Sequence, residues 1–214
     1  MEQIKIAIPN KGRLKNKSID ILTKTNSYKI FENTDKNLSF ESSNNKIIVF
    51  LVRAQDIPFL IASETVDLGI TGFDIVKEFS FLNIQQLGFL NFGHCRMVVA
   101  ADEFGKINSI DDLQDEMSVC TSFANITENF IKTTGLNLKI VKLSGAIESA
   151  IKLGLADFII DITSSGKTLK ANNLKIVNEL FKSEAVLISR KNLNKDKKTR
   201  VFDIRDKILN TLKS

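Results

Sequence analysis

The sequence predicts an α/β protein, and three observations lead to that class. Short β-branched segments alternate with stretches of helical periodicity along all 214 residues. These segments are apolar throughout, which is typical of strands covered on both faces by helices. With 43% hydrophobic and 26% charged residues, the chain is long enough to build a substantial core. We therefore expect mainly parallel sheet with helices on both faces.

Eight segments have the length and composition of buried strands. In chain order they are IKIAI (4–8), KIIVFLV (46–52), VDLGIT (66–71), RMVVAA (96–101), MSVCT (117–121), LKIVKL (138–143), DFIIDI (157–162) and AVLIS (185–189). Two helices can be placed by their period. The first ends at Gly135, a natural C-terminal cap, and its apolar face is formed by Phe123, Ile126 and Phe130. The second lies near the C-terminus, and its apolar face is formed by Val201, Ile204, Ile208 and Leu212.

The order of the segments indicates two lobes. Gly88 and Gly93 precede the strand at 96–101, and the strand at 185–189 follows another apolar stretch, VNELF. If the chain crosses between lobes at both places, residues 92–182 form one lobe. Residues 1–91 and 183–214 then combine into the other, and a cleft is expected between the two.

Composition excludes several classes of protein. The longest apolar runs are far shorter than the ~20 residues of a membrane span, and MEQIKIAIPN lacks a signal-peptide pattern, so we expect a cytoplasmic protein. Cys95, Cys120 and the single histidine, His94, lack zinc-site spacing, and no metal ligands are predicted. The net charge of +5 allows an anionic ligand, but one Tyr and no Trp argue against nucleic-acid binding. The densest basic run, residues 191–200, is expected to be solvated surface.

Residues 161–173, DITSSGKTLKANN, contain a GKT that is similar to the end of a nucleotide-binding P-loop. The P-loop pattern requires a glycine five residues before Gly166, and that position is Asp161. The P-loop is therefore excluded. A buried strand ends at Asp161, and a helix is expected to begin at Lys167 or Thr168.

This turn has two interpretations. Backbone N–H groups and hydroxyls gathered at a positive helix end would suit a phosphate monoester, and Asp161 could accept hydrogen bonds from sugar hydroxyls. Equally, the segment fits an ordinary β-turn in which a serine caps a helix. The local sequence leaves both open.

Two further strand ends carry cations. Lys11 and Arg13 flank Gly12 in a turn after the first strand, and in open α/β sheets ligands bind outside the carboxyl ends of strands. Arg53 directly follows another apolar strand, where a guanidinium can bind an anion bidentately. The alternatives are a solvated Lys11 and Arg13, and a surface Arg53 paired with Asp56.

Taken together, these stretches resemble the catalytic subunit of ATP phosphoribosyltransferase in its short form. The matching motifs are PNKGRL (9–14), RAQDIP (53–58), DLGITGFD (67–74), FGHCRMVVAA (92–101) and LSGAIESAIKLGLADFIIDITSSGKTLKANNL (143–174). They keep the family order over residues 4–190, and the last motif is long and distinctive.

The resemblance implies a two-lobed fold similar to that of the type II periplasmic binding proteins. It also implies the first step of histidine biosynthesis, catalysed by a pentosyltransferase. In that step N1 of the adenine of ATP attacks the anomeric carbon of 5-phosphoribosyl 1-pyrophosphate, and pyrophosphate leaves. Mg²⁺ accompanies the substrate phosphates, and the product is N1-(5-phosphoribosyl)-ATP.

Site residues follow from the same resemblance. Phosphoribosyl pyrophosphate is expected at Glu148, Asp161, Thr163, Ser164, Ser165, Gly166, Lys167 and Thr168. ATP is expected at Lys11, Gly12, Arg13, Asp74 and Phe123. The catalytic candidates are Arg53, Lys11 and Arg13, because preplaced cations stabilise the charge that builds on leaving pyrophosphate.

The sequence departs from the family pattern at two positions. The family tends to have proline after the aromatic residue, where this chain has Ala124, and many short forms have an arginine where this chain has Lys36. Short-form members rely on a separate regulatory subunit similar to histidyl-tRNA synthetase. The resemblance therefore implies a hetero-oligomer.

Two other functions fit part of the pattern. A non-catalytic small-molecule binding module on the same two-lobed fold would not explain the phosphate turn together with Arg53. A nucleobase phosphoribosyltransferase usually has two adjacent acidic residues before its T-G-x-T turn, whereas here Asp161 is followed by Ile162.

Overall fold

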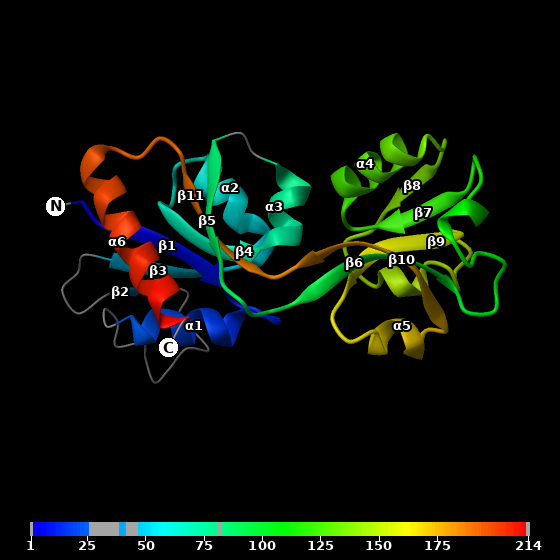
Figure 1. Ribbon diagram of the computed structural model, residues 1–214, viewed down its shortest axis with the longest axis horizontal. Coiled ribbons are helices and arrows are strands. Elements are labelled where there is room, and N and C mark those ends of the chain that lie inside the picture. The colour runs from blue at the N-terminus through cyan, green and yellow to red at the C-terminus, as the bar shows by residue number, and fades with distance from the viewer. Residues whose placement is uncertain (1, 26–38, 42–46, 81–82, 213–214) are drawn as a thin grey trace. The chain divides into compact units, whose positions relative to one another are not determined.

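The computed structural model describes residues 2–25, 39–41, 47–80 and 83–212. The chain divides into two compact units (Figure 1). Unit 1 comprises Met1–Gly93 and Glu184–Ser214, and unit 2 comprises His94–Ser183. The chain therefore passes from one unit to the other twice. The passages expected from the sequence lie at residues 91/92 and 182/183.

The sheet of unit 1 is mixed and has a parallel centre. Its strands lie in the order β2-β3-β1-β4-β11-β5. Their bounds are β1 (Ile4–Pro9), β2 (Ser39–Glu41), β3 (Ile47–Val52), β4 (Leu68–Gly72), β5 (Ile84–Phe89) and β11 (Ala185–Arg190). β1 pairs in parallel with β3 and β4, whereas β2, β5 and β11 pair antiparallel with their neighbours. The carboxyl ends of β3, β1 and β4 therefore lie side by side.

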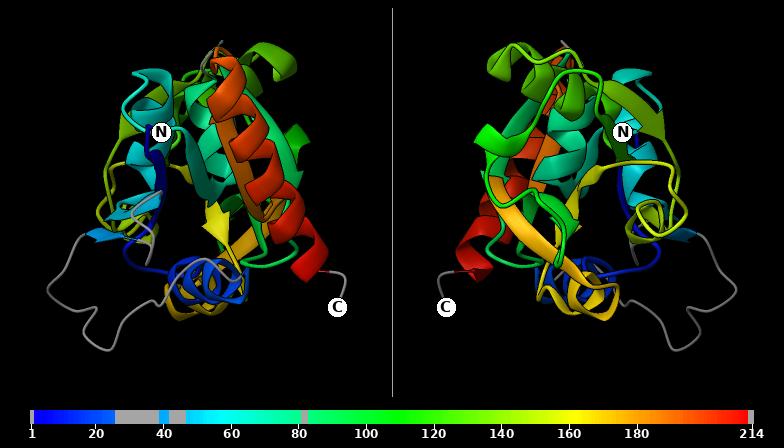
Figure 2. Two further views of the ribbon diagram at one scale, coloured as in Figure 1. Left: turned by 90° about the vertical axis from the view of Figure 1, so that its left-hand side faces the viewer. Right: turned by 90° about the vertical axis from the view of Figure 1, so that its right-hand side faces the viewer.

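Helices cover both faces of this sheet. They are α1 (Lys15–Lys24), the short 3-10 helix η1 (Ala54–Asp56), α2 (Ile57–Ala62), α3 (Phe73–Phe79) and α6 (Lys195–Thr211). Leu22 of α1 and Ile208 of α6 belong to the core on one face, and Ile57 of α2 belongs to the core on the other. Burying such an aliphatic side chain stabilises the fold by about 1.5–3 kcal/mol. Figure 2 shows α1 in blue and α6 in red from two further directions.

The sheet of unit 2 is also mixed, in the order β10-β6-β9-β7-β8. Its strands are β6 (Cys95–Asp102), β7 (Ser118–Thr121), β8 (Lys139–Lys142), β9 (Phe158–Thr163) and β10 (Leu174–Ser183). β7 pairs in parallel with β8 and β9, whereas β6 pairs antiparallel with β9 and β10. The carboxyl ends of β9, β7 and β8 therefore share one edge.

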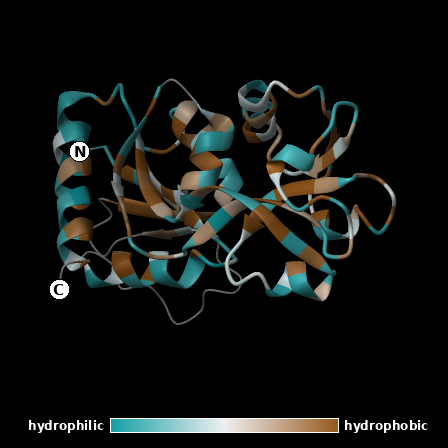
Figure 3. Ribbon diagram, turned by 45° about the vertical axis from the view of Figure 1, so that its right-hand side comes forward, coloured by the Kyte–Doolittle hydropathy of each residue, from teal (hydrophilic) through white to brown (hydrophobic). Residues whose placement is uncertain are grey.

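Two apolar cores lie on opposite faces of this second sheet. Its helices are η2 (Ile110–Asp112), α4 (Ala124–Thr134), η3 (Ile147–Ser149) and α5 (Lys167–Ala171). Phe130 of α4 packs on one face with Phe158 and Ile160. Ile147 of η3 and Leu169 of α5 pack on the other face. Figure 3 shows the resulting concentration of hydrophobic residues on the strands.

The α/β class predicted from the sequence is confirmed, and all eight expected strands are present with ends shifted by no more than two residues. Lys46, at the start of one expected strand, lies outside the described residues. The sheets are mixed rather than mainly parallel, because β6, β10 and β11, which flank the two passages, run antiparallel to their neighbours. The helix stop at Gly135 (φ 73°) and the buried face of α6 are as expected.

Most of the basic run at 191–200 is exposed, as expected, but Lys197 departs from the expectation of a solvated surface. Lys197 in α6 is 5% exposed, and its Nζ pairs with Glu2 Oε1 at 2.7 Å and Asp67 Oδ1 at 3.1 Å. The sequence pattern alone does not show this burial. Lys197 belongs to a polar run, but on the helix it lies on the same face as the buried apolar residues of α6. None of the helices in the described ranges combines the length and the hydropathy of a membrane span.

Candidate active site

Three neighbouring strand ends of unit 1 carry candidate residues. Pro9 at the end of β1 lies opposite Val52 at the end of β3, and the Asn10 N–H donates to the Val52 carbonyl at 2.7 Å. Arg53 follows β3, the turn with Arg13 follows β1, and Asp74 follows β4. Segments about forty residues apart in sequence are thus joined at one edge of the sheet.

Arg53 is exposed and begins η1 with an extended backbone (φ −67°, ψ 137°). Within the described residues its guanidinium has no ion-pair partner, so the alternative pairing with Asp56 is absent. The Asp56 N–H instead donates to the Arg53 carbonyl at 3.0 Å. Thr71 Oγ1 of β4 donates to the Ala54 carbonyl at 2.7 Å, which ties the Arg53 turn to the centre of the sheet.

The turn after β1 holds Lys11, Gly12 and Arg13 in different surroundings. Lys11 is exposed, and Gly12 has φ +76°, a left-handed conformation that favours glycine. Arg13 Nη2 donates to Asp74 Oδ1 at 2.8 Å, and the exposed fractions of the two side chains are 24% and 1%. Two residues that the resemblance assigns to the ATP site are therefore partners in one ion pair.

The turn after β9 exposes main-chain donors. Gly166 has φ +74° and precedes α5, and its N–H donates to Thr163 Oγ1 at 3.0 Å. The Lys167 N–H reaches Ser165 Oγ at 3.4 Å. The N–H groups of Ser164, Ser165 and Thr168 have no acceptor among the described residues. Two N–H groups of the turn therefore donate to hydroxyls within it, and the other three can bind an anion.

Asp161 and Glu148 lie near this turn. The side chain of Asp161 is half-buried, and its Oδ1 accepts a hydrogen bond from the Ile162 N–H at 2.8 Å. Glu148 is half-buried in η3, whose neighbour Ile147 packs in the same core as Ile159 of β9, and its carboxylate has no partner within the described ranges. Both carboxylates can accept hydrogen bonds from sugar hydroxyls.

Phe123, which the resemblance assigns to the ATP site, has a buried ring. Its side chain is 9% exposed and belongs to the apolar core that includes Ile126 and Phe130. Its N–H donates to Thr121 Oγ1 at 2.9 Å, and Thr121 Oγ1 donates to the Ile160 carbonyl at 2.7 Å.

The surroundings of Cys120 in β7 shift the pKa of its thiol. The pKa of its thiol is raised, first by burial and then by the negative charge of Asp161. The thiol therefore stays protonated at neutral pH and does not act as a nucleophile. In the described part of the chain, no group of three or more His, Cys, Asp or Glu side chains is arranged to hold a metal ion.

Sequence reasoning missed three polar residues at these strand ends. Asn10 Oδ1 is buried without a hydrogen-bond partner in the described residues, so it is an acceptor that a ligand donor could satisfy. Thr71 and Thr121 are fully buried, and their hydroxyls donate to the carbonyls of Ala54 in η1 and Ile160 in β9, respectively. A polar residue at the end of an otherwise apolar strand is the signal that could have found them. Lys36 lies outside the described residues.

The fold defines a class of two-lobed α/β proteins similar to the type II periplasmic binding proteins. One solved neighbour is the substrate binding protein of an amino acid ABC transporter, with a TM-score of 0.62 over 98% of this chain and 92% of that one. Its sequence identity of 15% means that the likeness shows the fold alone.

Within that class, the chain belongs to the ATP phosphoribosyltransferase family. The family model HisG, ATP phosphoribosyltransferase, matches residues 53–213. The ATP phosphoribosyltransferase of Methanocaldococcus jannaschii is 39% identical over 201 residues, which cover 92% of this chain and 68% of that protein. The HisG:HisZ complex of ATP phosphoribosyl transferase from Thermotoga maritima contains a chain with a TM-score of 0.84 and 31% identity over 99% of both chains.

These findings confirm the family, the pentosyltransferase class and the step of histidine biosynthesis that the sequence resemblance implies. They do not favour a non-catalytic binding module or a nucleobase phosphoribosyltransferase. The chain spans about two thirds of the length of the archaeal relatives, for example 65% of the Methanococcus maripaludis protein.

Proposed function

We propose that this chain transfers the phosphoribosyl group of 5-phosphoribosyl 1-pyrophosphate to N1 of ATP, and that residues at the strand ends of each unit bind the substrates. The observation that carries the proposal is the family match over residues 53–213, which includes both Arg53 and the turn at 163–168. The bond from N1 to the anomeric carbon forms as the bond from that carbon to pyrophosphate breaks, and the electrons of the broken bond leave with pyrophosphate.

The 5-phosphate of the ribose is proposed to bind the turn at residues 163–168. The N–H groups of Ser164, Ser165 and Thr168 are available there, and the hydroxyls of the turn add further donors. Asp161 and Glu148 are proposed to accept hydrogen bonds from the ribose hydroxyls. The phosphate would therefore accept hydrogen bonds from the turn, and the ribose hydroxyls would donate hydrogen bonds to the two carboxylates.

The leaving pyrophosphate is proposed to be stabilised by Arg53, Lys11 and Arg13. Negative charge develops on this group as the bond breaks, and cations that are already in place lower the barrier. The exposed guanidinium of Arg53 supports this role, because it has no competing ion pair in the described part of the chain. No covalent intermediate with the enzyme is needed.

ATP is proposed to bind along Lys11, Gly12 and Arg13, where the chain turns at a glycine with open space around it. Asp74 and Phe123, which were also expected to bind ATP, are 1% and 9% exposed. We propose that these two residues act through the groups they hold in place. Phe123 anchors the turn between β7 and α4 by its buried ring.

Mg²⁺ is proposed to enter with the substrate phosphates. This ion commonly binds through one or two carboxylates and the phosphates of a substrate, retaining several waters. Asp161 and Glu148 are both half-buried carboxylates, so they suit a magnesium ion shared with the substrate phosphates better than one held by protein ligands alone. The ion would neutralise negative charge on the pyrophosphate.

As a partner we propose a regulatory subunit similar to histidyl-tRNA synthetase, in line with the HisG:HisZ composition of the Thermotoga maritima complex. We also propose a cytoplasmic location.

The proposed function predicts pyrophosphate release when the purified chain is mixed with ATP, phosphoribosyl pyrophosphate and Mg²⁺, measured with and without the regulatory subunit. Release should require both substrates, and adenine should not replace ATP. Release with adenine instead of ATP would indicate a nucleobase phosphoribosyltransferase. Binding of either substrate without any release, in the presence of the regulatory subunit, would contradict the proposal.

Replacing Gly166 with alanine should raise the KM for phosphoribosyl pyrophosphate roughly tenfold, because an alanine at φ +74° is strained by about 1–2 kcal/mol and the turn relaxes away from its binding geometry. Gly135→Ala is a matched control. Gly135 has φ +73°, belongs to the same unit and also has nothing within 4 Å of an added Cβ. Thermal unfolding should show similar losses of stability for both variants. An equal rise in KM for both would remove the turn from the binding site.

A further inference from the structure

We propose that Asp74 is a positioning residue that orients Arg13 for the reaction, and that position 72 is a glycine because this ion pair fills the space beside it. The inference rests on the proposed function, in which Arg13 contacts the phosphates of the substrates. It replaces the expectation that Asp74 itself binds ATP.

The ion pair joins two neighbouring strand ends. Arg13 lies between β1 and α1, and Asp74 lies in the first turn of α3, which directly follows β4. β1 and β4 are parallel and pair at Ala7 and Gly69, so the segments after them emerge side by side. The 2.8 Å hydrogen bond from Arg13 Nη2 to Asp74 Oδ1 therefore connects residues 61 positions apart.

Burial assigns different roles to the two side chains. Asp74 is 1% exposed, so its carboxylate cannot reach a nucleotide without giving up its place beside the arginine. The side chain of Arg13 is 24% exposed and has five N–H donors in a rigid planar fork. Because the fork is planar, a bond that fixes one edge also fixes the direction of the remaining donors.

Gly72 leaves the space that the pair occupies. Its backbone is extended (φ −85°, ψ 144°), a conformation open to any residue, so the backbone alone does not require glycine. A Cβ at this position would lie 2.3 Å from Asp74 Oδ1 and 3.2 Å from Arg13 Nη2. Any side chain here would therefore push the carboxylate or the guanidinium out of place.

The backbone beside Arg13 is anchored as well. Gly93 has φ +66°, and a Cβ there would lie 2.2 Å from Leu14 Cδ2 and 3.8 Å from Arg13 Cγ. Leu14 is 2% exposed and anchors the turn in the core of unit 1. The backbone of Arg13 is thus anchored by the buried Leu14 beside it and its guanidinium is held by Asp74, which is the arrangement expected for a preorganised cation.

A double-mutant cycle of Arg13→Ala and Asp74→Ala tests this role. Each single change should lower kcat by ~10²-fold, the usual effect of losing one preplaced charge. If Asp74 acts through Arg13, the double variant should be no slower than Arg13→Ala within about threefold, because the two changes remove one function. The KM for ATP should change little on adding Asp74→Ala to Arg13→Ala. Asp74→Asn, which retains an oxygen acceptor, should recover part of the loss.

Two results would overturn the inference. Losses that multiply to ~10⁴-fold in the double variant, with a raised KM for ATP, would mean that Asp74 contacts the nucleotide independently. Coupling seen in thermal unfolding but absent from kcat would mean a purely structural pair. Gly72→Ala gives a second measurement if Asp74→Ala fails to fold, and it should reproduce the loss in kcat.

The control and a second readout separate this inference from the proposed function. Asp203→Ala removes an exposed partner of Lys207 on α6 and should leave kcat unchanged. The same cycle measured on the dissociation constant of pyrophosphate by calorimetry tests the pair even if the wild type shows no turnover. Absence of turnover with intact coupling would reject the reaction, whereas turnover with multiplicative losses would reject the role of Asp74.

Discussion

Replacing Arg53 with alanine is expected to lower kcat/KM for phosphoribosyl pyrophosphate by ~10²-fold or more, with little change in stability. Arg53 is exposed and, within the described residues, its guanidinium has no ion-pair partner. Its removal therefore breaks no ion pair or side-chain hydrogen bond among the described residues, and the free energy of unfolding should stay within about 0.5 kcal/mol of wild type. The loss would come from the transition state, in which negative charge builds on the leaving pyrophosphate.

The measurement is initial-rate pyrophosphate release, with urea unfolding of the same samples. Arg53→Lys should recover part of the rate, because a lysine restores the charge but not the bidentate fork. Arg205→Ala is the matched control, since Arg205 pairs with Asp206 and stacks on Phe202 within α6. Full turnover of Arg53→Ala would show that this arginine has no part in catalysis, even if the family activity is present.

The sequence predicted every strand inside the two sheets and the edge strand β8, and it missed the other three edge strands. β2, β5 and β10 are the missed strands, and each lies at an edge of its sheet. An edge strand packs fewer apolar side chains, so its sequence has less hydrophobic contrast. β10 also contains two register shifts against β6, which interrupt any regular alternation.

The candidate site was predictable where it is local in sequence and unpredictable where it joins distant segments. The turn at 163–168, with its glycine and hydroxyls, and Arg53 after β3 are properties of single stretches. The Arg13–Asp74 pair joins positions 61 apart, and the Lys197–Asp67 bond joins positions 130 apart. A single sequence contains no signal for such pairings, because they depend on which strands become neighbours in the sheet.

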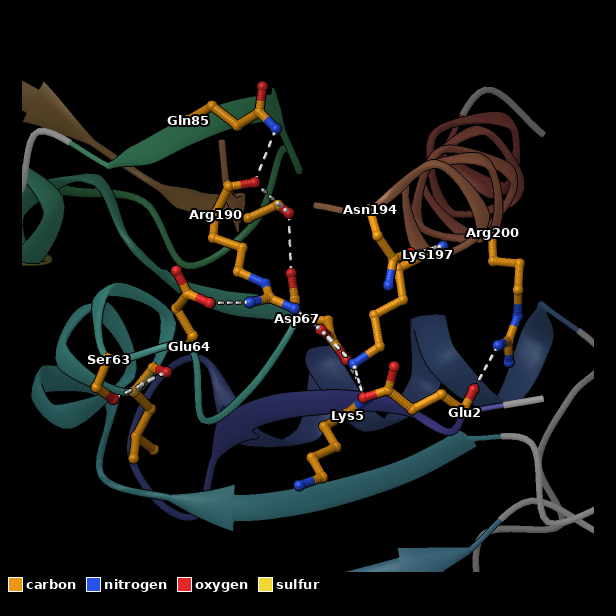
Figure 4. A network of polar contacts seen from close by, with 12 residues as sticks. Glu2, Lys5, Ser63, Glu64, Asp67, Gln85, Arg190, Asn194, Lys197 and Arg200 are labelled. Atoms are coloured by element: carbon orange, nitrogen blue, oxygen red, sulfur yellow. Dashed lines mark hydrogen bonds and ion pairs between the residues drawn. The ribbon is translucent and has the colours of Figure 1, made fainter. Parts of the chain in front are cut away.

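Asp67→Ala is expected to destabilise unit 1 by about 3–5 kcal/mol, the usual cost of removing one partner of a buried ion pair. Asp67 is 1% exposed, and Figure 4 shows it at the centre of a polar network. Its Oδ1 accepts hydrogen bonds from Arg190 Nη2 at 3.0 Å and Lys197 Nζ at 3.1 Å, and its Oδ2 accepts one from the Lys5 N–H at 3.0 Å. Strand β11 and helix α6 are thereby bonded to the loop that leads into β4.

Lys197 remains charged in this network, which makes the loss of Asp67 severe. Burial alone would lower the pKa of Lys197, but the hydrogen bonds and charges of Glu2 and Asp67 outweigh burial and raise the pKa. Without Asp67, the ammonium would keep Glu2, whose side chain is 67% exposed, as its acidic partner. Arg190 would likewise keep Glu64, whose side chain is 56% exposed. Lys197 and Arg190 would then be two buried cations that repel each other, and little solvent would screen that repulsion.

The test is urea unfolding monitored by circular dichroism, comparing Asp67→Ala with two further variants. Asp203→Ala, which removes an exposed ion-pair partner on α6, should cost less than about 0.5 kcal/mol. The double variant Asp67→Ala with Lys197→Met should be more stable than Asp67→Ala alone, because it removes one of the cations left without its partner. If Asp67→Ala unfolds at the same urea concentration as Asp203→Ala, the network does not stabilise the fold. If the double variant is no more stable than Asp67→Ala, the cost arises from lost packing or from the Lys5 hydrogen bond and not from the buried charge.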